Sequence, residues 1–166
     1  MVAAAEGREA FDALFVGHFP SVLRTVAYVA GDRGVAEEIA QDAFVHLLRN
    51  WDTVSRYERP DLWVRRVAVR DAQRERRRTW RRPVVEASAA VPAPGPEQLE
   101  LDVVAAVSAL PAKQRAIVAL FYYEDRPMAE IAAIVGCAVS TGWSQLHHAR
   151  KRLSQALAEE VSGDVR

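Results

Sequence analysis

The sequence contains a single cysteine, Cys137, so no internal disulfide can hold the fold together. A lone cysteine among apolar residues of a short turn is typical of a small packed side chain. The four histidines lack metal-ligand spacing, because His18 and His46 are isolated and the adjacent His147 and His148 would point about 100° apart on a helix. We therefore expect no metal site and no cofactor.

Catalytic patterns are also missing. The chain has no glycine-rich phosphate loop and no nucleophile elbow, and acidic residues such as Glu37 and Glu38 have the spacing of a helix surface. No apolar run is long enough to predict a membrane span or a signal peptide. These absences argue against an enzyme and against membrane insertion, and they favour a cytoplasmic protein.

Positive and negative charges balance over the chain, with 22 Lys and Arg against 22 Asp and Glu. They are unevenly placed, because residues 1–83 carry fifteen arginines and twelve acids, whereas residues 84–166 carry seven basic and ten acidic residues. An excess of positive charge attracts phosphates. The first half is thus the better candidate for contact with nucleic acid.

Apolar residues recur every three or four positions through most of the chain, which is typical of amphipathic helices. We predict helices over residues 8–30, with an interruption or kink at Pro20, over 35–51, and onward from Pro60. Residues 84–98 contain three prolines and a glycine, which indicates a flexible linker. The prediction is an all-α fold of two small helical domains, residues 1–83 and 99–166, joined by this Pro/Ala-rich linker.

The second domain, with helices predicted over 99–109 and 112–124, ends in a pattern typical of a helix-turn-helix. A short apolar-faced helix opens after Pro127, Gly136 supplies the turn residue, and a second helix begins near Ser140. Such a motif places its second helix in the major groove of DNA. An ordinary helical hairpin has the same spacing and is the alternative interpretation.

Basic residues crowd the helix that begins at Pro60. Nine arginines lie between Arg65 and Arg82, opposed by only two acids. This density suits several phosphate contacts, and Trp63 and Trp80 could stack on unpaired bases. The alternatives are a solvated helix face for the arginines and a buried anchor for Trp63.

Three strings in this order carry a family resemblance: AEEIAQDAF, RYERPDLWVRRVA, and the block LPAKQR…YYED…EIA…GC. With the linker between the second and third, they resemble the extracytoplasmic-function (ECF) sigma factors of bacteria, in the minimal form with only regions two and four. The resemblance extends from about Phe11 to Leu157. It implies a factor that binds core RNA polymerase and promoter DNA, opens the minus-ten element, reads the minus-thirty-five element and starts transcription. Many members also bind an anti-sigma factor.

The resemblance also implies roles for individual residues. Within the helix over 35–51 it leaves Phe44, Leu47 and Leu48 as core. Polymerase binding is implied for the exposed residues Glu38, Gln41, Asp42, Arg49 and Asp52. Promoter opening is implied for residues 55–78 and upstream recognition for the second domain, and the implied DNA contacts are Trp63, Arg65, Arg66, Arg70, Arg74, Arg77, Arg78, Ser140, Thr141, Trp143, Ser144, Gln145, His148, Arg150 and Lys151.

The predicted recognition helix departs from the family. Relatives usually have Val, Lys and further Arg where this chain has Gly142, Trp143, Gln145 and His148. Glycine inside a helix costs about 1 kcal/mol relative to alanine, and loss of the Val predicts a core gap that Trp143 could fill by turning inward. Between Ser140 and His148 no fixed positive charge remains. Either the upstream site is unusual, or this domain has lost much of its DNA affinity.

Two other functions remain open. A degenerate sigma-like regulator would bind polymerase or an anti-sigma factor without starting transcription, and the neutral net charge and weak recognition helix favour it. A polymerase-independent repressor would instead dimerise to place two recognition helices about one turn of DNA apart.

Overall fold

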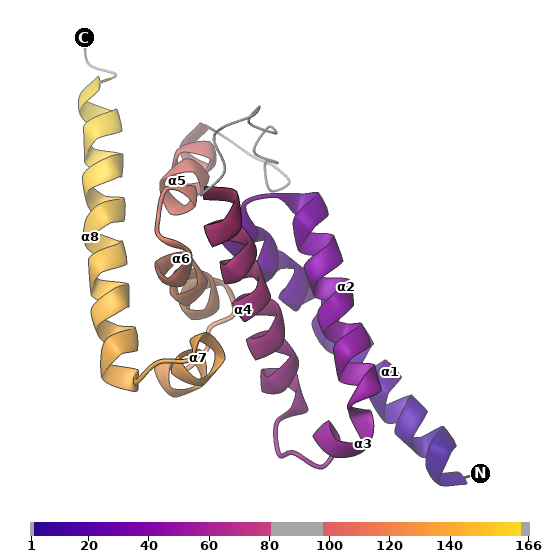
Figure 1. Ribbon diagram of the computed structural model, residues 1–166. Coiled ribbons are helices and arrows are strands. Elements are labelled where there is room, and N and C mark those ends of the chain that lie inside the picture. The colour runs from indigo at the N-terminus through magenta and orange to yellow at the C-terminus, as the bar shows by residue number, and fades with distance from the viewer. Residues whose placement is uncertain (1, 81–97, 164–166) are drawn as a thin grey trace.

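The computed structural model describes residues 2–80 and 98–163, and all regular structure within these two stretches is helical (Figure 1). The first stretch contains α1 (Val2–Ala30), α2 (Arg33–Arg49), α3 (Trp51–Val54) and α4 (Pro60–Trp80). The second contains α5 (Gln98–Ser108), α6 (Ala112–Val118), the π-helix η1 (Ala119–Tyr123), α7 (Met128–Val135) and α8 (Val139–Gly163). The predicted all-α class is confirmed. The predicted linker lies outside the described residues, except for Gln98.

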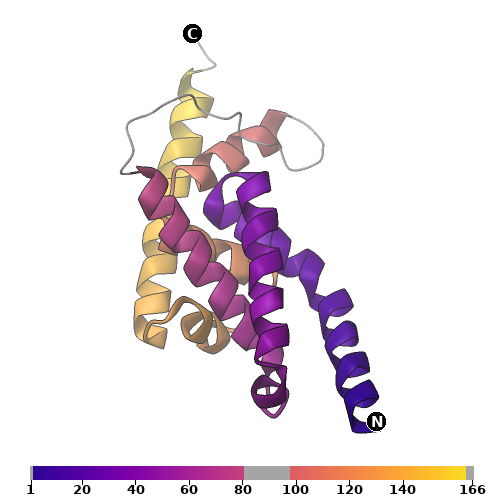
Figure 2. The ribbon, with the colours of Figure 1, turned by 45° about the vertical axis from the view of Figure 1, so that its right-hand side comes forward.

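Helix α1 is continuous, with Pro20 inside it, so no second helix begins at the predicted interruption. Its C-terminal half lies in the core through Val22, Val26 and Val29, whereas its N-terminal half projects from the bundle (Figure 2). By length and hydropathy alone, the segment Glu6–Ala30 is apolar enough to cross a membrane, contrary to the sequence expectation. Of this apolar stretch 28% is buried, and the three buried valines place its C-terminal half in the core.

Helices α1, α2 and α4 pack together and form the first helical group. Asp32 caps α2 by accepting a hydrogen bond from the backbone N–H of Val35 at 2.9 Å, and the helix therefore begins two residues before the predicted start. Buried alanines on α2, among them Ala36 and Ala40, allow the helices to approach closely. Phe44 and Leu47 are buried as predicted.

The predicted helix-turn-helix is confirmed as α7 and α8. Helix α7 begins after Pro127, and Gly136 ends it in the left-handed conformation with φ 72° and ψ 54°. The helix predicted over 112–124 is instead α6 followed by η1. A π-helix widens the backbone turn and shifts the direction of the side chains that follow.

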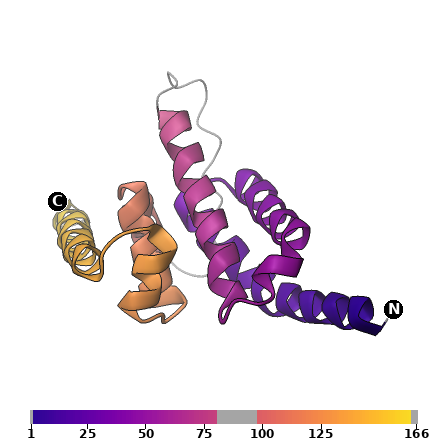
Figure 3. The same ribbon diagram turned by 60° about the horizontal axis from the view of Figure 1, so that its bottom comes forward.

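The two helical groups share one continuous buried interior. It includes Val26 and Val67 from the first group and Ile117, Leu120 and Ile131 from the second. Figure 3 shows α4 between the α1–α2 pair and the second group. The described helices therefore form one closed arrangement, and the predicted domain boundaries at 83 and 99 remain predictions.

Candidate nucleic-acid interface

One face of α4 presents the arginine row, which we define as Arg66, Arg70, Arg74, Arg77 and Arg78. All five side chains are exposed or partly exposed, as the sequence predicted. Asp71 lies 3.8 Å from Arg70 and 3.5 Å from Arg74, and Glu75 lies 3.1 Å from Arg78. Exposed pairs of this kind are weak, so their arginines can exchange them for phosphates. Arg66 and Arg77 have no ion pair within the described chain.

Arg65 does not belong to this row, and the prediction that it faces phosphates is wrong for this structure. Its side chain is 3% exposed and points away from solvent into the second helical group. Nε donates to Oε2 of Glu124 at 2.8 Å, and Nη2 donates to the hydroxyl of Ser21 at 2.7 Å. The next residue, Arg66, lies on the exposed face because consecutive helix positions are about 100° apart.

The Arg65–Glu124 pair belongs to the interface network, a set of three arginines and three acids that joins α4 to the residues around α7. Arg126 bridges Glu124 at 2.7 Å and Glu130 at 2.8 Å. Arg59 bridges Glu130 at 2.6 Å and Asp61 at 3.0 Å. The complete network is Arg59, Asp61, Arg65, Glu124, Arg126 and Glu130.

Glu124 is charged at the centre of this network although it is buried. Burial raises the pKa of Glu124, but the hydrogen bond from the Thr25 hydroxyl at 2.6 Å and the positive charges of Arg65 and Arg126 outweigh it and hold the pKa below 4.5. Asp61 behaves in the same way, because Arg59 and Arg65 overcome the effect of burial and lower the pKa of that carboxyl.

His18 is also part of this environment, although its sequence position predicted an isolated residue. Its Nδ1 lies 3.3 Å from Nη1 of Arg65. Burial and the neighbouring positive charge of Arg65 lower the pKa of His18 below 6.5, so the ring is neutral at pH 7. The unprotonated nitrogen of a neutral ring can accept a hydrogen bond from Arg65, whereas both ring nitrogens of a charged histidine are donors.

The outer face of α8 is the second candidate surface. Ser140, Ser144, His148 and Lys151 are exposed as predicted. Thr141 and Gln145 are only half-exposed, and the side-chain oxygen of Gln145 accepts a hydrogen bond from Gln114 of α6 at 3.1 Å. Gln145 is thus directed partly toward its own domain, which weakens the prediction that it reads bases.

Gly142 leaves no gap in the core of the helix-turn-helix, so that prediction is wrong. The glycine is buried, and a Cβ placed on it would lie 2.5 Å from Sδ of Met128, a buried residue of α7. The methionine occupies the space that a larger residue at 142 would need. The glycine and the methionine therefore complement each other.

Trp143 turns outward and not inward. It is 49% exposed and packs edge-on against Phe121, with 5.8 Å between ring centres. The guanidinium of Arg150 lies 5.6 Å from the ring centres of Phe121 and Tyr122, and its Nε donates to the Tyr122 hydroxyl at 2.6 Å. These contacts orient both Trp143 and Arg150 toward η1, at the flank of the recognition helix.

The predicted polymerase-binding residues Glu38, Gln41, Asp42, Arg49 and Asp52 are all exposed. Leu48, which the sequence assigned to the core, is instead 54% exposed, and Val45 on the same helix is 44% exposed. Helix α2 therefore presents a mixed polar and apolar surface.

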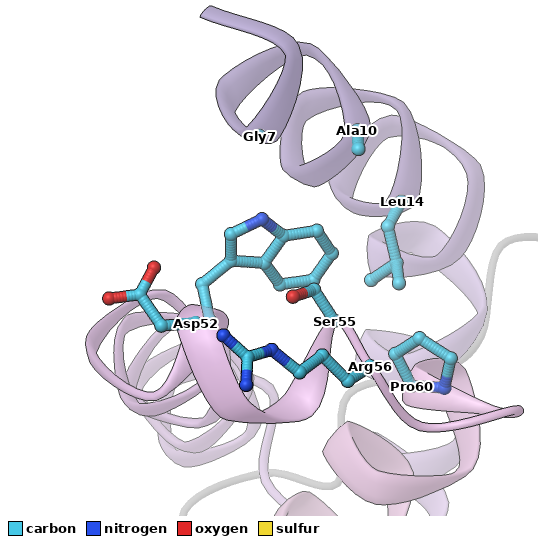
Figure 4. Close-up of a pocket in the computed structure, with 8 residues that line it drawn as sticks. Gly7, Ala10, Leu14, Asp52, Ser55, Arg56 and Pro60 are labelled. Carbon is cyan, nitrogen blue, oxygen red and sulfur yellow. The ribbon is translucent and has the colours of Figure 1, made fainter. Parts of the chain in front are cut away.

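A hollow of about 440 Å³ lies between the N-terminal half of α1 and the α3 region (Figure 4). Its lining combines the Trp51 side chain with the polar groups of Asp52, Ser55 and Arg56, beside the start of α4 at Pro60. Trp51 also packs edge-on against Phe11 of α1 at 5.4 Å. Sequence reasoning missed this hollow because α1 contributes residues far from the others along the chain.

Two family descriptions match the chain in the order expected. Sigma-70 region 2 matches residues 14–82, and Sigma-70 region 4 matches residues 100–153. The chain belongs to the sigma-70 family. Region 2 thus contains most of α1 and all of α2 to α4, and region 4 contains the helix-turn-helix.

The chain is 30% identical over 165 residues to the ECF RNA polymerase sigma factor SigE of Mycolicibacterium smegmatis. The match covers 92% of this chain and 63% of that relative, so the chain spans less than two thirds of the relative's length.

Two solved structures have the same fold. The sigma factor RpoE in complex with the anti-sigma factor NepR from Bartonella quintana aligns with a TM-score of 0.76 at 23% identity, covering 90% of this chain and 98% of that one. CnrH in complex with the cytosolic domain of CnrY aligns with a TM-score of 0.68 at 19% identity, covering 95% and 96%.

In these terms the interface network joins region 2 to region 4. Sequence reasoning placed Arg65 on the DNA surface because it lies in an arginine-rich run, and it did not select Glu124, Arg126 or Glu130. The only available signal was the EDRPMAE string, in which acids and an arginine cluster before α7.

Proposed function

We propose that this chain is a cytoplasmic sigma factor that binds core RNA polymerase, directs it to promoter DNA and starts transcription without enzymatic activity of its own. The observation that carries this proposal is the arginine row, exposed on α4 of region 2. Arginines on one helix face can neutralise several successive phosphates. The helix-turn-helix of region 4 supplies a second surface of the kind that enters the major groove.

Helix α2 is the proposed polymerase contact. The exposed polar residues there surround the exposed apolar side chains Val45 and Leu48. A partly apolar centre with a polar rim is typical of protein interfaces.

Transcription with purified core polymerase tests the proposal. The chain and core are incubated with a random duplex library, the retained DNA is sequenced, and enriched duplexes serve as run-off templates. A sigma factor enriches a common promoter motif and yields transcripts from it. Enrichment of no motif, or of a motif that gives no transcript, would contradict the proposal.

Charge reversal separates DNA opening from polymerase binding. We expect R66E/R70E to abolish promoter opening, measured as permanganate-reactive thymines, while co-elution with core polymerase persists. The matched control is R8E/R33E, which reverses two exposed arginines outside α4 and should open DNA normally. Arg65 is left unchanged because its substitution would also disrupt the interface network. If R66E/R70E opens the promoter as well as the control, the arginine row is only a solvated helix face.

A sigma-like regulator that does not start transcription is the second candidate. The closed arrangement favours it, because Arg65 is buried against region 4 and Arg150 is held by Tyr122. It predicts binding to core without transcripts in the same assay. One of the solved structures with this fold contains an anti-sigma factor, and we propose a partner of that class for this chain as well.

A further inference from the structure

Two arginines from different regions converge on one glycine. Arg76 belongs to α4 of region 2, and Arg115 belongs to α6 of region 4. A Cβ placed on Gly31, just after α1, would lie 3.5 Å from Nη1 of Arg76 and 3.4 Å from Nη1 of Arg115. Gly31 has a φ of 76°, a conformation that favours glycine. The two guanidinium groups therefore border the same small space beside an exposed turn.

Neither arginine has an acidic partner among residues 6–79 and 103–158, whose side chains the structure describes. Asp32 follows Gly31 directly, but one of its carboxylate oxygens is already used to cap α2 through Val35. Glu75 precedes Arg76 directly, but its carboxylate pairs with Arg78 at 3.1 Å. This differs from the interface network, where every buried arginine contacts a carboxylate.

Arg115 is deeply buried, at 2% exposure, for a residue without a counter-charge. Its Nη2 donates to the Leu110 carbonyl at 2.9 Å, its Nη1 donates to the Tyr28 carbonyl at 3.4 Å, and its Nε has no acceptor. Burial and the neighbouring Arg76 lower the pKa of Arg115 to about 10, so it still carries its charge at pH 7. Burying an uncompensated charge is unfavourable.

Other donors nearby also lack acceptors. Nε of Arg76 is buried without a partner, and so is Nε2 of Gln73, which lies one turn earlier on α4. Positions three apart on a helix lie on the same side. The end of α4 thus presents an excess of hydrogen-bond donors toward the interior.

We propose that Arg76 and Arg115 form a binding site for a phosphate group at the junction of α1, α4 and α6. A tetrahedral oxyanion can accept hydrogen bonds from both guanidinium groups at once. A ligand would approach from the side of exposed Gly31 and half-buried Arg76, because the backbone of a duplex is too large to reach the buried Arg115. The ligand is therefore inorganic phosphate or the terminal phosphate of a nucleotide, and it joins region 2 to region 4. This proposal does not depend on the proposed function.

Titration calorimetry on the full chain tests this site, with sodium phosphate and pyrophosphate as probes at constant pH and ionic strength. We expect saturable binding, and binding weaker by at least about tenfold in R76Q, because the variant loses a charge-assisted contact to the anion. R76K keeps the positive charge but loses the planar guanidinium group, so its affinity for phosphate should lie between those of the parent and R76Q. Tighter binding of pyrophosphate than of phosphate indicates a nucleotide as the source, whereas equal binding indicates free phosphate.

The matched control is R77Q, which removes the same charge from the next, exposed residue of α4. It should bind phosphate as the parent does. Equal loss in R76Q and R77Q would overturn the proposal, because general electrostatic attraction would then explain the binding. The absence of saturable binding in the parent would also overturn it. The proposal also fails if duplex DNA competes with phosphate and R77Q weakens this competition as much as R76Q does. If phosphate raises the melting temperatures of R76Q and of the parent equally, Arg76 does not contribute to phosphate binding and the proposal fails.

Discussion

The contact between region 2 and region 4 is built in opposite ways at the two ends of α4. At the start of the helix, the interface network pairs three arginines with three acids. At its end, Arg76 and Arg115 approach each other without an acid among the described residues. Figure 1 shows these two ends at the bottom and the top of α4. At the start of α4 the positive and negative charges are paired with one another. At its end, positive charge and hydrogen-bond donors remain without acidic partners among the side chains that the structure describes.

This difference indicates that the two ends of α4 have different roles. Removing one partner from a buried charge pair leaves the other charge uncompensated, which is far more costly than the net contribution of the intact pair suggests. The network therefore sets how firmly the regions hold together and in which register. The arginine pair contributes less by itself and is available for an added anion.

The largest effect is expected for Glu124→Ala in the interface network. This substitution removes the carboxylate that accepts a hydrogen bond from buried Arg65, leaving only Asp61 at 3.7 Å, and it removes the acceptor of Thr25. We expect a loss of about 3–5 kcal/mol in the free energy of unfolding, measured by urea denaturation.

The control for this variant is Glu75→Ala, which breaks the exposed pair with Arg78 and should cost no more than about 0.5 kcal/mol. Equal losses in the two variants would show that the network is no more important than a surface pair.

The contact between Gly142 and Met128 inside region 4 allows a second test of stability, one that involves packing and no charge. Gly142→Val would press its side chain into Met128, and such overpacking costs about 1–3 kcal/mol. Met128→Ala leaves a cavity by itself but makes room for the valine. We therefore expect the double variant to be more stable than the sum of the two single changes predicts, measured as a double-mutant cycle. Additive losses would mean that the two residues do not share this space.

The sequence predicted the features that depend on local rules. Pro60 and Pro127 mark helix starts, and Gly136 marks a left-handed helix end, because each residue restricts or permits particular backbone angles. The family resemblance left Phe44, Leu47 and Leu48 as core, and the structure buries the first two and exposes Leu48. These predictions required no knowledge of distant segments.

The errors at Arg65 and Gly142 depend on contacts between segments far apart in the sequence. Arg65 and Arg66 have the same local sequence, but Arg65 meets Glu124, 59 residues away. Gly142 appeared to leave a gap because the filling side chain, Met128, belongs to another helix. Local pattern gives the helices and their caps, whereas the partner of a charged residue depends on how the helices pack.

Acid should weaken the two ends of the contact unequally. Glu124, Asp61 and Glu130 have pKa values below their ordinary ones, so the unfolded chain takes up their protons first as the pH falls. Their contribution is complete above about pH 4.5 and is lost as the pH falls through the lowered values. For a buried group, a pKa lower by one in the folded chain than in the unfolded chain corresponds to about 1.4 kcal/mol of stability.

The lowered pKa of His18 acts with the same sign, beginning as the pH falls below 6.5. The arginine pair does not titrate in this range. The urea midpoint of the parent should therefore fall between pH 7 and pH 3, most steeply below about pH 4.5, and that of Glu124→Ala should fall less. Parallel curves would exclude the network as the source of acid sensitivity.

The smallest effect is expected for Arg115→Met at the other end of α4. The substitution removes a buried charge that has no carboxylate to leave behind, and methionine fills most of the same volume. Two carbonyl hydrogen bonds are lost, which opposes this gain. In phosphate-free buffer we expect the free energy of unfolding to change by less than about 1 kcal/mol. Arg126→Met is the matched comparison, because it makes the same substitution but leaves Glu124 and Glu130 short of a partner, and it should be clearly less stable. If Arg115→Met is destabilised as much as Arg126→Met, the charges at both ends of α4 are equally well compensated, and the contrast between the two ends does not hold.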